Sequence, residues 1–226
     1  MGFIGNGSGI TNLGALISTQ LFTSSGTWNR PSGTTKIRVT VTGGGGSASG
    51  VPGDLGNDMG GSGSAGGTAI KIIDVTSISS VSVTVGNGGT VPLATSGSTG
   101  AAGQTSSFGS HCSASGGSGA PSYSNTSNVS QFPSGDGSGG DINIRGGHGL
   151  YPKINESNAN TISGHMGGAS YWGGSGRPAM DDDFTGANAN FSGNAASGWG
   201  SGGAGAARSF SGGNGKQGIV VVENFK

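Results

Sequence analysis

The 226-residue chain is poor in the residues on which many protein classes depend. Only 9% of residues are charged, and ten Lys and Arg balance ten Asp and Glu, so the chain lacks the basic surface that binds nucleic acid or an anionic membrane. No apolar run reaches the roughly 18 residues of a membrane-spanning helix. A single cysteine excludes an intrachain disulfide framework. We therefore expect neither a nucleic-acid partner nor membrane insertion.

Glycine is what the chain has in excess, at 53 of 226 positions against a usual share of about 7%. The glycines follow no strict three-residue repeat and only 7 prolines accompany them, which excludes collagen. Each glycine in regular structure costs about 0.5–1 kcal/mol relative to alanine, so the glycine-rich parts need a special arrangement. Two arrangements are open, alone or mixed: extended left-handed helices of the polyglycine II type, packed side by side, and stacked tight turns with positive φ.

Branched apolar residues gather in short windows, as they do in strands, whereas a disordered chain would spread them. Residues Lys36–Thr42 alternate Ile and Val with Lys, Arg and Thr, so a period of two puts three apolar side chains on one face. Further strands are predicted over Leu21–Ser25, Thr68–Val75, Ser80–Gly86 and Gly218–Glu223, the last either buried on both faces or with its second face against another subunit. The second and third of these are close enough in sequence to pair as a hairpin, and Gly26–Thr35 is predicted to be a turn. The pattern predicts an all-β fold with a small β-sandwich-like scaffold.

The spacing of the windows predicts how the chain is organised. Residues 1–20 would be a shaft-like or attachment segment, and residues 21–226 a glycine-rich β domain. Two glycine-rich inserts, at about 43–67 and 87–217, would project from the scaffold. The second insert is too long for a structureless loop in a compact domain, so it must have an architecture of its own.

Five stretches of the chain form a recognisable series. The opening reads Phe-Thr-Ser-Ser-Gly-Thr-Trp over 22–28 and Pro-Ser-Gly-Thr-Thr-Lys-Ile-Arg-Val-Thr-Val-Thr-Gly-Gly-Gly-Gly over 31–46. Later stretches read Ser-Val-Thr-Val-Gly-Asn-Gly-Gly over 82–89, Ser-Ser-Phe-Gly over 106–109 and Gly-Lys-Gln-Gly-Ile-Val-Val-Val-Glu over 215–223. The series resembles the glycine-rich domains of bacteriophage tail fibres, and residues 3–13 are similar to a short segment of fibre shafts. The part from about 121 to 211 has no counterpart in that family pattern.

The resemblance implies a function at the bacterial surface. It implies a receptor-binding domain of the virion, at the distal tip of a tail fibre, and a homotrimer. The partners it implies are the rest of the tail fibre and either a bacterial outer-membrane protein or lipopolysaccharide or another surface glycan. Trp28 and Pro31 match the structural turn of the family, so they are not expected to contact a receptor.

The long insert carries most of the aromatic side chains, dispersed among Gly, Ser, Asn and Thr. Antibody loops use the same composition, because Tyr and Trp anchor a ligand while small polar residues adapt to it. Phe132, Phe184 and Phe191 are expected instead to fill gaps between glycine layers. The acidic cluster at 181–183 lacks the pattern of a calcium loop and fits an exposed loop tip better. The candidate receptor-binding residues are Tyr123, Tyr151, Tyr171, Trp172, Asp182 and Trp199.

No constellation in the sequence predicts catalysis or metal binding, so we expect neither an enzyme nor a cofactor. His111, His148 and His165 lack metal-ligand spacing, and Cys112 is expected to be a small buried residue. Glycoside hydrolysis needs two carboxylates placed on either side of the glycosidic bond. The sequence does not indicate that any two of the candidates converge in this way; the candidates are Asp136, Asp141, Glu156 and the cluster at 181–183. The first alternative to a receptor-binding tip is a purely structural fibre or virion-decoration domain. A less favoured alternative is a surface-glycan depolymerase.

Overall fold

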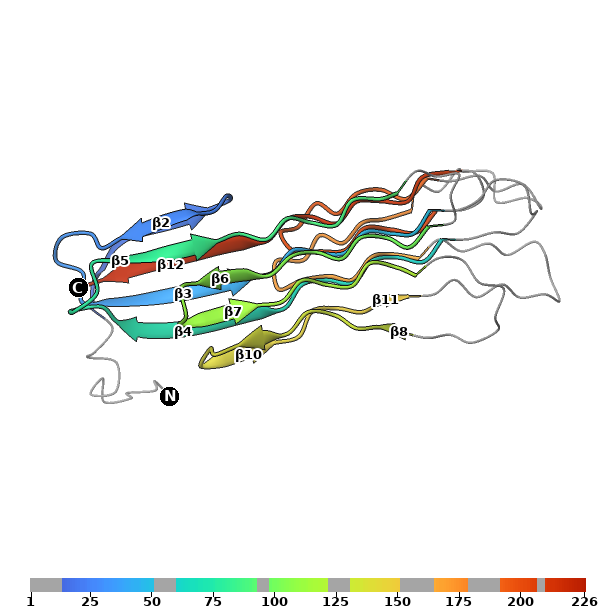
Figure 1. Cartoon of the computed structure of the whole chain (residues 1–226). Helices are drawn as coiled ribbons and strands as arrows, with labels where there is room; N and C mark the ends of the chain where they lie inside the picture. The colour runs from blue at the N-terminus through green and yellow to red at the C-terminus, as the bar shows by residue number, and fades with distance from the viewer. Residues whose placement is uncertain are drawn as a thin grey trace, which may run out of the picture.

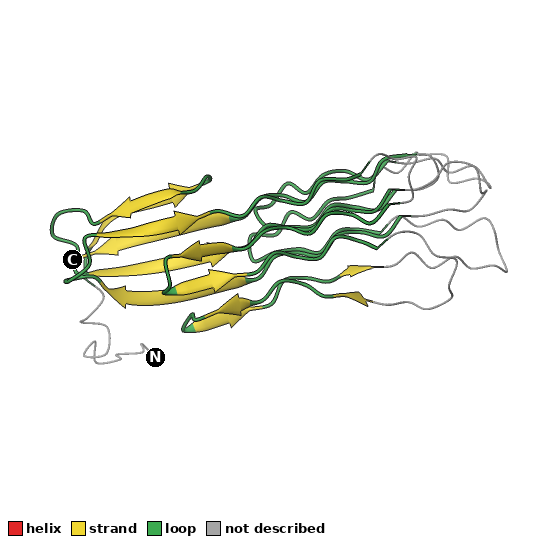
Figure 2. Cartoon of the chain, in the orientation of Figure 1, coloured by secondary structure: helices red, strands yellow, loops and turns green. Residues whose placement is uncertain are grey.

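The computed structural model describes residues 14–50, 60–92, 98–121, 131–150, 165–178, 192–206 and 210–226. Within these ranges the regular structure consists of strands, and no helix long and apolar enough to cross a membrane occurs (Figure 2). The strands are β1 (Leu16–Phe22), β2 (Gly26–Asn29), β3 (Lys36–Thr42), β4 (Thr68–Asp74), β5 (Ser80–Thr84), β6 (Ser106–Phe108), β7 (Cys112–Ala114), β8 (Gln131–Phe132), β9 (Gly137–Ser138), β10 (Ile142–Ile144), β11 (Gly149–Leu150) and β12 (Ile219–Phe225). The all-β prediction is confirmed.

Two five-stranded antiparallel sheets stack as a sandwich at one end of the molecule (Figure 1). Sheet A has the order β1-β12-β3-β4-β10, and sheet B has the order β2-β5-β6-β7-β9. Between them Trp28 meets Phe108 edge to face, with ring centroids 5.8 Å apart. The buried Trp28 indole donates a hydrogen bond of 3.1 Å to Asn224 Oδ1 of the opposite sheet. This pairing satisfies two polar groups that burial would otherwise penalise.

The period of two in β3 places its apolar residues as predicted. Ile37, Val39 and Val41 are fully buried and face sheet B. They lie opposite Asn224, Val222 and Val220 of β12 in the register of sheet A. A central strand of the sandwich is therefore determined by local alternation alone.

Three predictions about individual strands are wrong. The first strand starts at Leu16 rather than Leu21, because its earlier residues pair with β12 as far as Phe225. Residues Gly26–Asn29, predicted as part of a turn, form β2, because Trp28 packs into the core. Strands β4 and β5 do not form a hairpin: β4 lies in sheet A and β5 in sheet B. Each of them buries an apolar face in the same core, so they pack across the sandwich instead of sharing a sheet.

Beyond the sandwich, the glycine-rich residues continue the strands as a glycine bundle, drawn in Figure 2 as loops apart from the short paired strands β8 and β11. We use this name for the described residues 43–50, 60–67, 85–92, 98–105, 115–121, 131–136, 145–150, 165–178, 192–206 and 210–217. Successive backbone N–H groups of 43–50 donate to three different neighbours in turn. Gly43 donates to Gly67, Gly44 to Gln104 and Gly45 to Lys216, and the cycle then repeats with Gly46 to Ser64, Ser47 to Ala101 and Ala48 to Gly213.

A three-residue cycle is the hydrogen-bond pattern of polyglycine II helices, in which each extended chain bonds laterally to several others. Residues 60–67 exemplify it, because every one of them is buried. Their backbone donates to segments 115–118, 147–150 and 200–206 and accepts from 43–49, Gly135 and Gly168. Of the two arrangements left open by the sequence, the bundle adopts the extended helices. Positive φ among the described glycines is confined to Gly33, Gly109, Gly139, Gly173, Gly174 and Gly200.

Close approach of backbones explains the composition of the bundle. A methyl group on Gly45 would collide with the carbonyl of Ser201. In residues 60–67 every side chain is that of Ser or Ala, and the Ser hydroxyls join the lateral network: the Oγ atoms of Ser62 and Ser64 each accept 3.0 Å hydrogen bonds, from Leu150 N and Gly149 N. The bundle is thus held mainly by backbone hydrogen bonds, with few apolar side chains.

The segments of the bundle end together, at the end remote from the sheets. Gly50 N donates to Ser98 O at 3.0 Å, Gly60 N to Ala206 O at 2.8 Å and Gly205 N to His165 O at 3.0 Å. Five of these six residues directly adjoin intervals of the chain outside the described ranges, and Gly205 is one residue away from such an interval. We call this place the far end; the sandwich and the backbone bond from Lys226 N to Ala15 O lie at the opposite end (Figure 1).

Candidate functional site

The six predicted receptor-binding residues do not all fall in the described part of the chain. Tyr171, Trp172 and Trp199 are described, whereas Tyr123, Tyr151 and Asp182 lie outside the described residues, as do Phe184 and Phe191. Phe132, predicted to fill a gap in the glycine layers, is buried. The prediction for Phe132 is confirmed.

Tyr171 and Trp172 form the tip of a tight turn between the bridged residues Ser170 and Gly173. Their rings meet edge to face at 5.1 Å, and both side chains are exposed. The indole N–H of Trp172 donates a 2.9 Å hydrogen bond to the Oγ1 of Thr42, the last residue of β3. The turn therefore lies where the sandwich meets the bundle.

Trp199 lies beside the same turn. Ser170 Oγ donates a 2.6 Å hydrogen bond to the Trp199 carbonyl. Ser201 Oγ bridges to Ser170 Oγ at 3.2 Å and donates to Gly173 O at 2.6 Å. The Lys216 ammonium stands 5.1 Å from the centre of the Trp199 ring, a cation–π geometry. We call Tyr171, Trp172 and Trp199 the aromatic cluster.

The aromatic cluster is separated from the far end by the length of the bundle. From Thr42 to Gly50 the extended chain covers eight residues at about 3.1 Å each, or roughly 25 Å. Two other candidates follow described bundle segments in the sequence. Tyr151 comes directly after Leu150, and the 181–183 cluster comes shortly after Arg177 and Pro178. Both described segments lead to the far end. The three described candidates therefore lie at the sandwich end of the bundle, away from the far end.

A hollow of about 360 Å³ in the surface of the bundle was missed by sequence reasoning. It is lined by Met166, Gly174, Ser175, Arg177, Asn194, Ala195 and Ser197. The backbone bond from Asn194 N to Arg177 O, 2.9 Å long, brings two distant segments together here. Within the described part of the chain, the side chains of Arg177 and Asn194 have no partner, so a guanidinium and an amide are free to bind acceptor-rich groups. No sequence signal marks the pair, because the contact depends on tertiary register.

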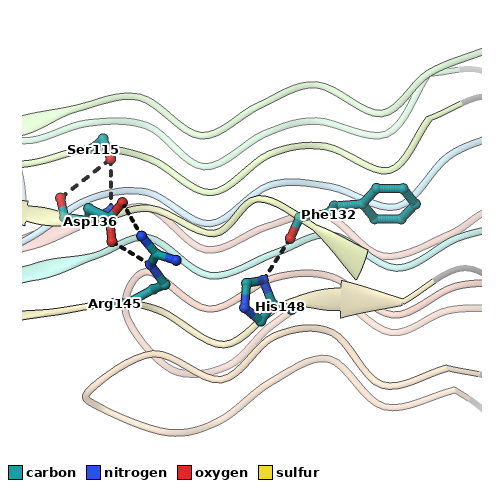
Figure 3. Close-up of polar contacts among 5 residues, drawn as sticks. All are labelled: Ser115, Phe132, Asp136, Arg145 and His148. Atoms are coloured by element: carbon teal, nitrogen blue, oxygen red, sulfur yellow. Dashed lines mark hydrogen bonds and ion pairs between the residues drawn. The ribbon is translucent and has the colours of Figure 1, made fainter. Parts of the chain in front are cut away.

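Two acidic candidates are engaged in structural contacts. Arg145 binds Asp136 through two hydrogen bonds, of 2.7 and 3.1 Å, while the Asp136 backbone N donates to Ser115 Oγ (Figure 3). The hydrogen bonds from Arg145 lower the pKa of Asp136, so this carboxyl is ionised and unsuited to donate a proton. Asp141 accepts a 2.8 Å hydrogen bond from the backbone N–H of Ile72. Both carboxylates thus serve the fold.

Comparison with known proteins identifies the family. A family model described as a glycine-rich domain matches residues 20–224. The chain belongs to this glycine-rich domain family. No curated protein matches the chain. The match covers the sandwich and the bundle together, so in this glycine-rich domain the two are parts of one unit of sequence.

Three further titratable side chains, those of Cys112, His148 and His165, are buried or partly buried in the fold. Burial raises the pKa of the Cys112 thiol to about 11, and the buried side chain confirms the prediction for this residue. His148 Nδ1 lies 2.9 Å from the Phe132 carbonyl (Figure 3), and burial lowers the pKa of His165. Within the described ranges no three side chains of the metal-binding types come together.

Proposed function

We propose that this glycine-rich domain is the distal tip of a bacteriophage tail fibre and binds a receptor on the bacterial outer surface. The observation that carries the proposal is that described bundle segments end together at the far end, joined there by backbone hydrogen bonds such as Gly50 N to Ser98 O at 3.0 Å and Gly60 N to Ala206 O at 2.8 Å. Six intervals of the sequence, 51–59, 93–97, 122–130, 151–164, 179–191 and 207–209, adjoin bundle segments. Recognition residues commonly lie in connections that a rigid scaffold presents together.

The sequence of these intervals has the composition of binding loops. Tyr123, Tyr151 and Asp182 lie in them, among Asn, Ser and Gly. With so little charge, recognition would depend on hydrogen bonds and aromatic stacking, and several copies on one virion would supply avidity. The receptor we propose is an outer-membrane protein, lipopolysaccharide or another surface glycan, bound without chemical conversion.

Binding to whole bacteria tests the proposal. The tagged protein is incubated with a panel that includes strains lacking single surface proteins and strains with truncated lipopolysaccharide. We expect strain-selective binding that disappears with one surface component. Tyr123→Ser, Tyr151→Ser and Asp182→Asn should reduce binding at an unchanged melting temperature. Tyr171→Ser is the matched control at the aromatic cluster, and it should retain binding.

The bundle also favours a second candidate, a purely structural fibre or virion-decoration domain. Lateral backbone bonding in three directions produces stiffness without any ligand. Folded protein that binds no strain of the panel would support this candidate and contradict the first. Equal loss of binding in all four variants would contradict the far-end assignment.

A further inference from the structure

The hollow at Arg177 and Asn194 lies on the side of the glycine bundle, between the aromatic cluster and the far end. Gly174, directly after the tight turn of that cluster, lines one part of it. Met166, the neighbour of His165 at the far end, lines another part. The volume of about 360 Å³ is at the lower end of the range of small-ligand sites, about 300–1,000 Å³. The hollow therefore has room for one small molecule.

Arg177 brings an unpaired positive charge to this hollow. The other arginines in the described part of the chain are bound within the fold: Arg30 donates to two backbone carbonyls, whereas Arg38 and Arg145 each pair with a carboxylate. Arg177 is exposed, and its guanidinium has no partner among the described residues. A guanidinium presents its N–H donors in a planar fork that fits a carboxylate. The unpaired arginine therefore favours an anionic ligand.

Further donors without partners line the same hollow. The backbone N–H groups of Ser175 and Ala195 donate to no group in the described part of the chain. The Asn194 side-chain amide is also unpaired there, and the bond from Asn194 N to Arg177 O keeps the two segments adjacent. Among the described residues, neither Asp nor Glu lines the hollow. No carboxylate of this lining therefore competes with an incoming anion for the donors.

The acceptors in the lining favour a carboxylate on a sugar over a simple inorganic anion. Ser197 Oγ donates a 3.2 Å hydrogen bond to Gly174 O, which leaves the Oγ lone pairs free to accept from a ligand hydroxyl. The Asn194 amide offers both a donor and an acceptor, as adjacent sugar hydroxyls require. Met166, 50% exposed, presents an apolar surface suited to the C–H groups of a sugar ring. A sulfate ion has no hydrogen to donate to these acceptors.

We propose that this hollow binds an acidic monosaccharide unit, a hexuronic acid. Arg177 and the N–H groups of Ser175 and Ala195 bind its carboxylate, and Asn194 and Ser197 bind its hydroxyls. Because the lining is exposed and the ligand is small, dissociation in the millimolar range and weakening by added salt are expected. The inference does not rest on the proposed function, since the hollow binds its ligand whether or not the far end binds a receptor.

A chemical-shift titration of ¹⁵N-labelled protein with D-glucuronic acid tests the proposal. The amide signals of Ser175, Arg177 and Ala195 should shift and saturate. D-Glucose has the same ring with a hydroxymethyl group in place of the carboxylate, and sodium sulfate supplies an anion without hydroxyl donors. Each should bind about tenfold more weakly or less. An equal response to glucose would contradict the role of the arginine, and an equal response to sulfate would overturn the assignment to a sugar.

Three variants test which residues bind the ligand. Arg177→Gln should weaken glucuronic acid binding about tenfold or more, because it removes the cation. Asn194→Asp should abolish binding, because it places a negative charge of similar shape beside the carboxylate. Arg38→Gln is the matched control: Arg38 is also partly exposed but belongs to the sandwich, so this variant should bind as wild type does. Wild-type protein without saturable shifts, or Arg177→Gln with unchanged affinity, would overturn the proposal.

Discussion

Replacing Gly100 with alanine probes directly whether the bundle depends on backbone contact. Gly100 is buried beside the helix formed by residues 43–50. A methyl group there would stand 2.5 Å from two backbone carbonyl oxygens, those of Ser47 and Ala48. Ordinary contact begins at 3.4 Å, so the two segments must separate by 3.4 − 2.5 = 0.9 Å.

The magnitude follows from the bonds that join these two segments. They are Gly44 N to Gln104 O at 2.9 Å, and Ser47 N to Ala101 O and Gly50 N to Ser98 O, each at 3.0 Å. A separation of 0.9 Å stretches all three beyond hydrogen-bond length. Each buried group left unsatisfied costs about 1–3 kcal/mol, against a gain of about 0.4–1 kcal/mol from a less flexible unfolded chain. We expect a net loss of roughly 2–8 kcal/mol, or a melting temperature about 4–30 °C lower.

Differential scanning calorimetry measures this change. The matched control is Gly26→Ala in β2, where the nearest atom to the new methyl group is a Phe22 ring carbon at 3.8 Å. That variant should melt at the wild-type temperature or slightly above it. A Gly100→Ala protein that melts within 2 °C of wild type, with the control behaving as expected, would refute the packing argument.

Three further outcomes are expected. Asn224→Leu leaves the buried Trp28 indole N–H without an acceptor, so chemical denaturation should show a loss of about 1–3 kcal/mol; an unchanged midpoint would mean that the indole finds another partner. Cys112, with its thiol pKa raised to about 11, should resist alkylation at pH 8 until the protein is unfolded, and rapid modification of the native state would contradict its burial. Burial lowers the pKa of His165, so the folded state binds fewer protons than the unfolded state. The stability that this histidine contributes should therefore be full above its unfolded pKa of about 6.5 and should fall as the pH decreases below that value. In thermal melts at pH 5–8, His165→Gln should flatten this pH dependence.

Much of the sandwich could be predicted because its signals are local. The alternation of Ile37, Val39 and Val41 identifies the buried face of β3 without any knowledge of its neighbours. The same reasoning failed for β4 and β5, which are close in sequence but lie in different sheets. A short separation in sequence permits two strands to form a hairpin but does not require it. Here β4 and β5 pack against each other across the shared core instead of pairing in one sheet.

The candidate site could be predicted only in part. Composition singled out Tyr171, Trp172 and Trp199, and the structure brings them together around Ser170 and Ser201. It could not predict that Trp172 would bond to Thr42 at the junction with the sandwich, since 130 residues separate them. The hollow at Arg177 and Asn194 was missed for the same reason.

The sequence by itself determined which face of each strand is apolar, because side-chain alternation is a local pattern along one strand. It also determined that the bundle can pack closely, because each glycine lacks a Cβ. Only the tertiary structure decided which glycine meets which carbonyl. Segments as alike as 43–50 and 60–67 carry only Ser and Ala besides Gly, side chains too small and too similar to specify a neighbour. Their register is imposed by the strands from which they extend, such as β3 paired with β4, and is then maintained by a backbone bond to the same neighbour at every third residue.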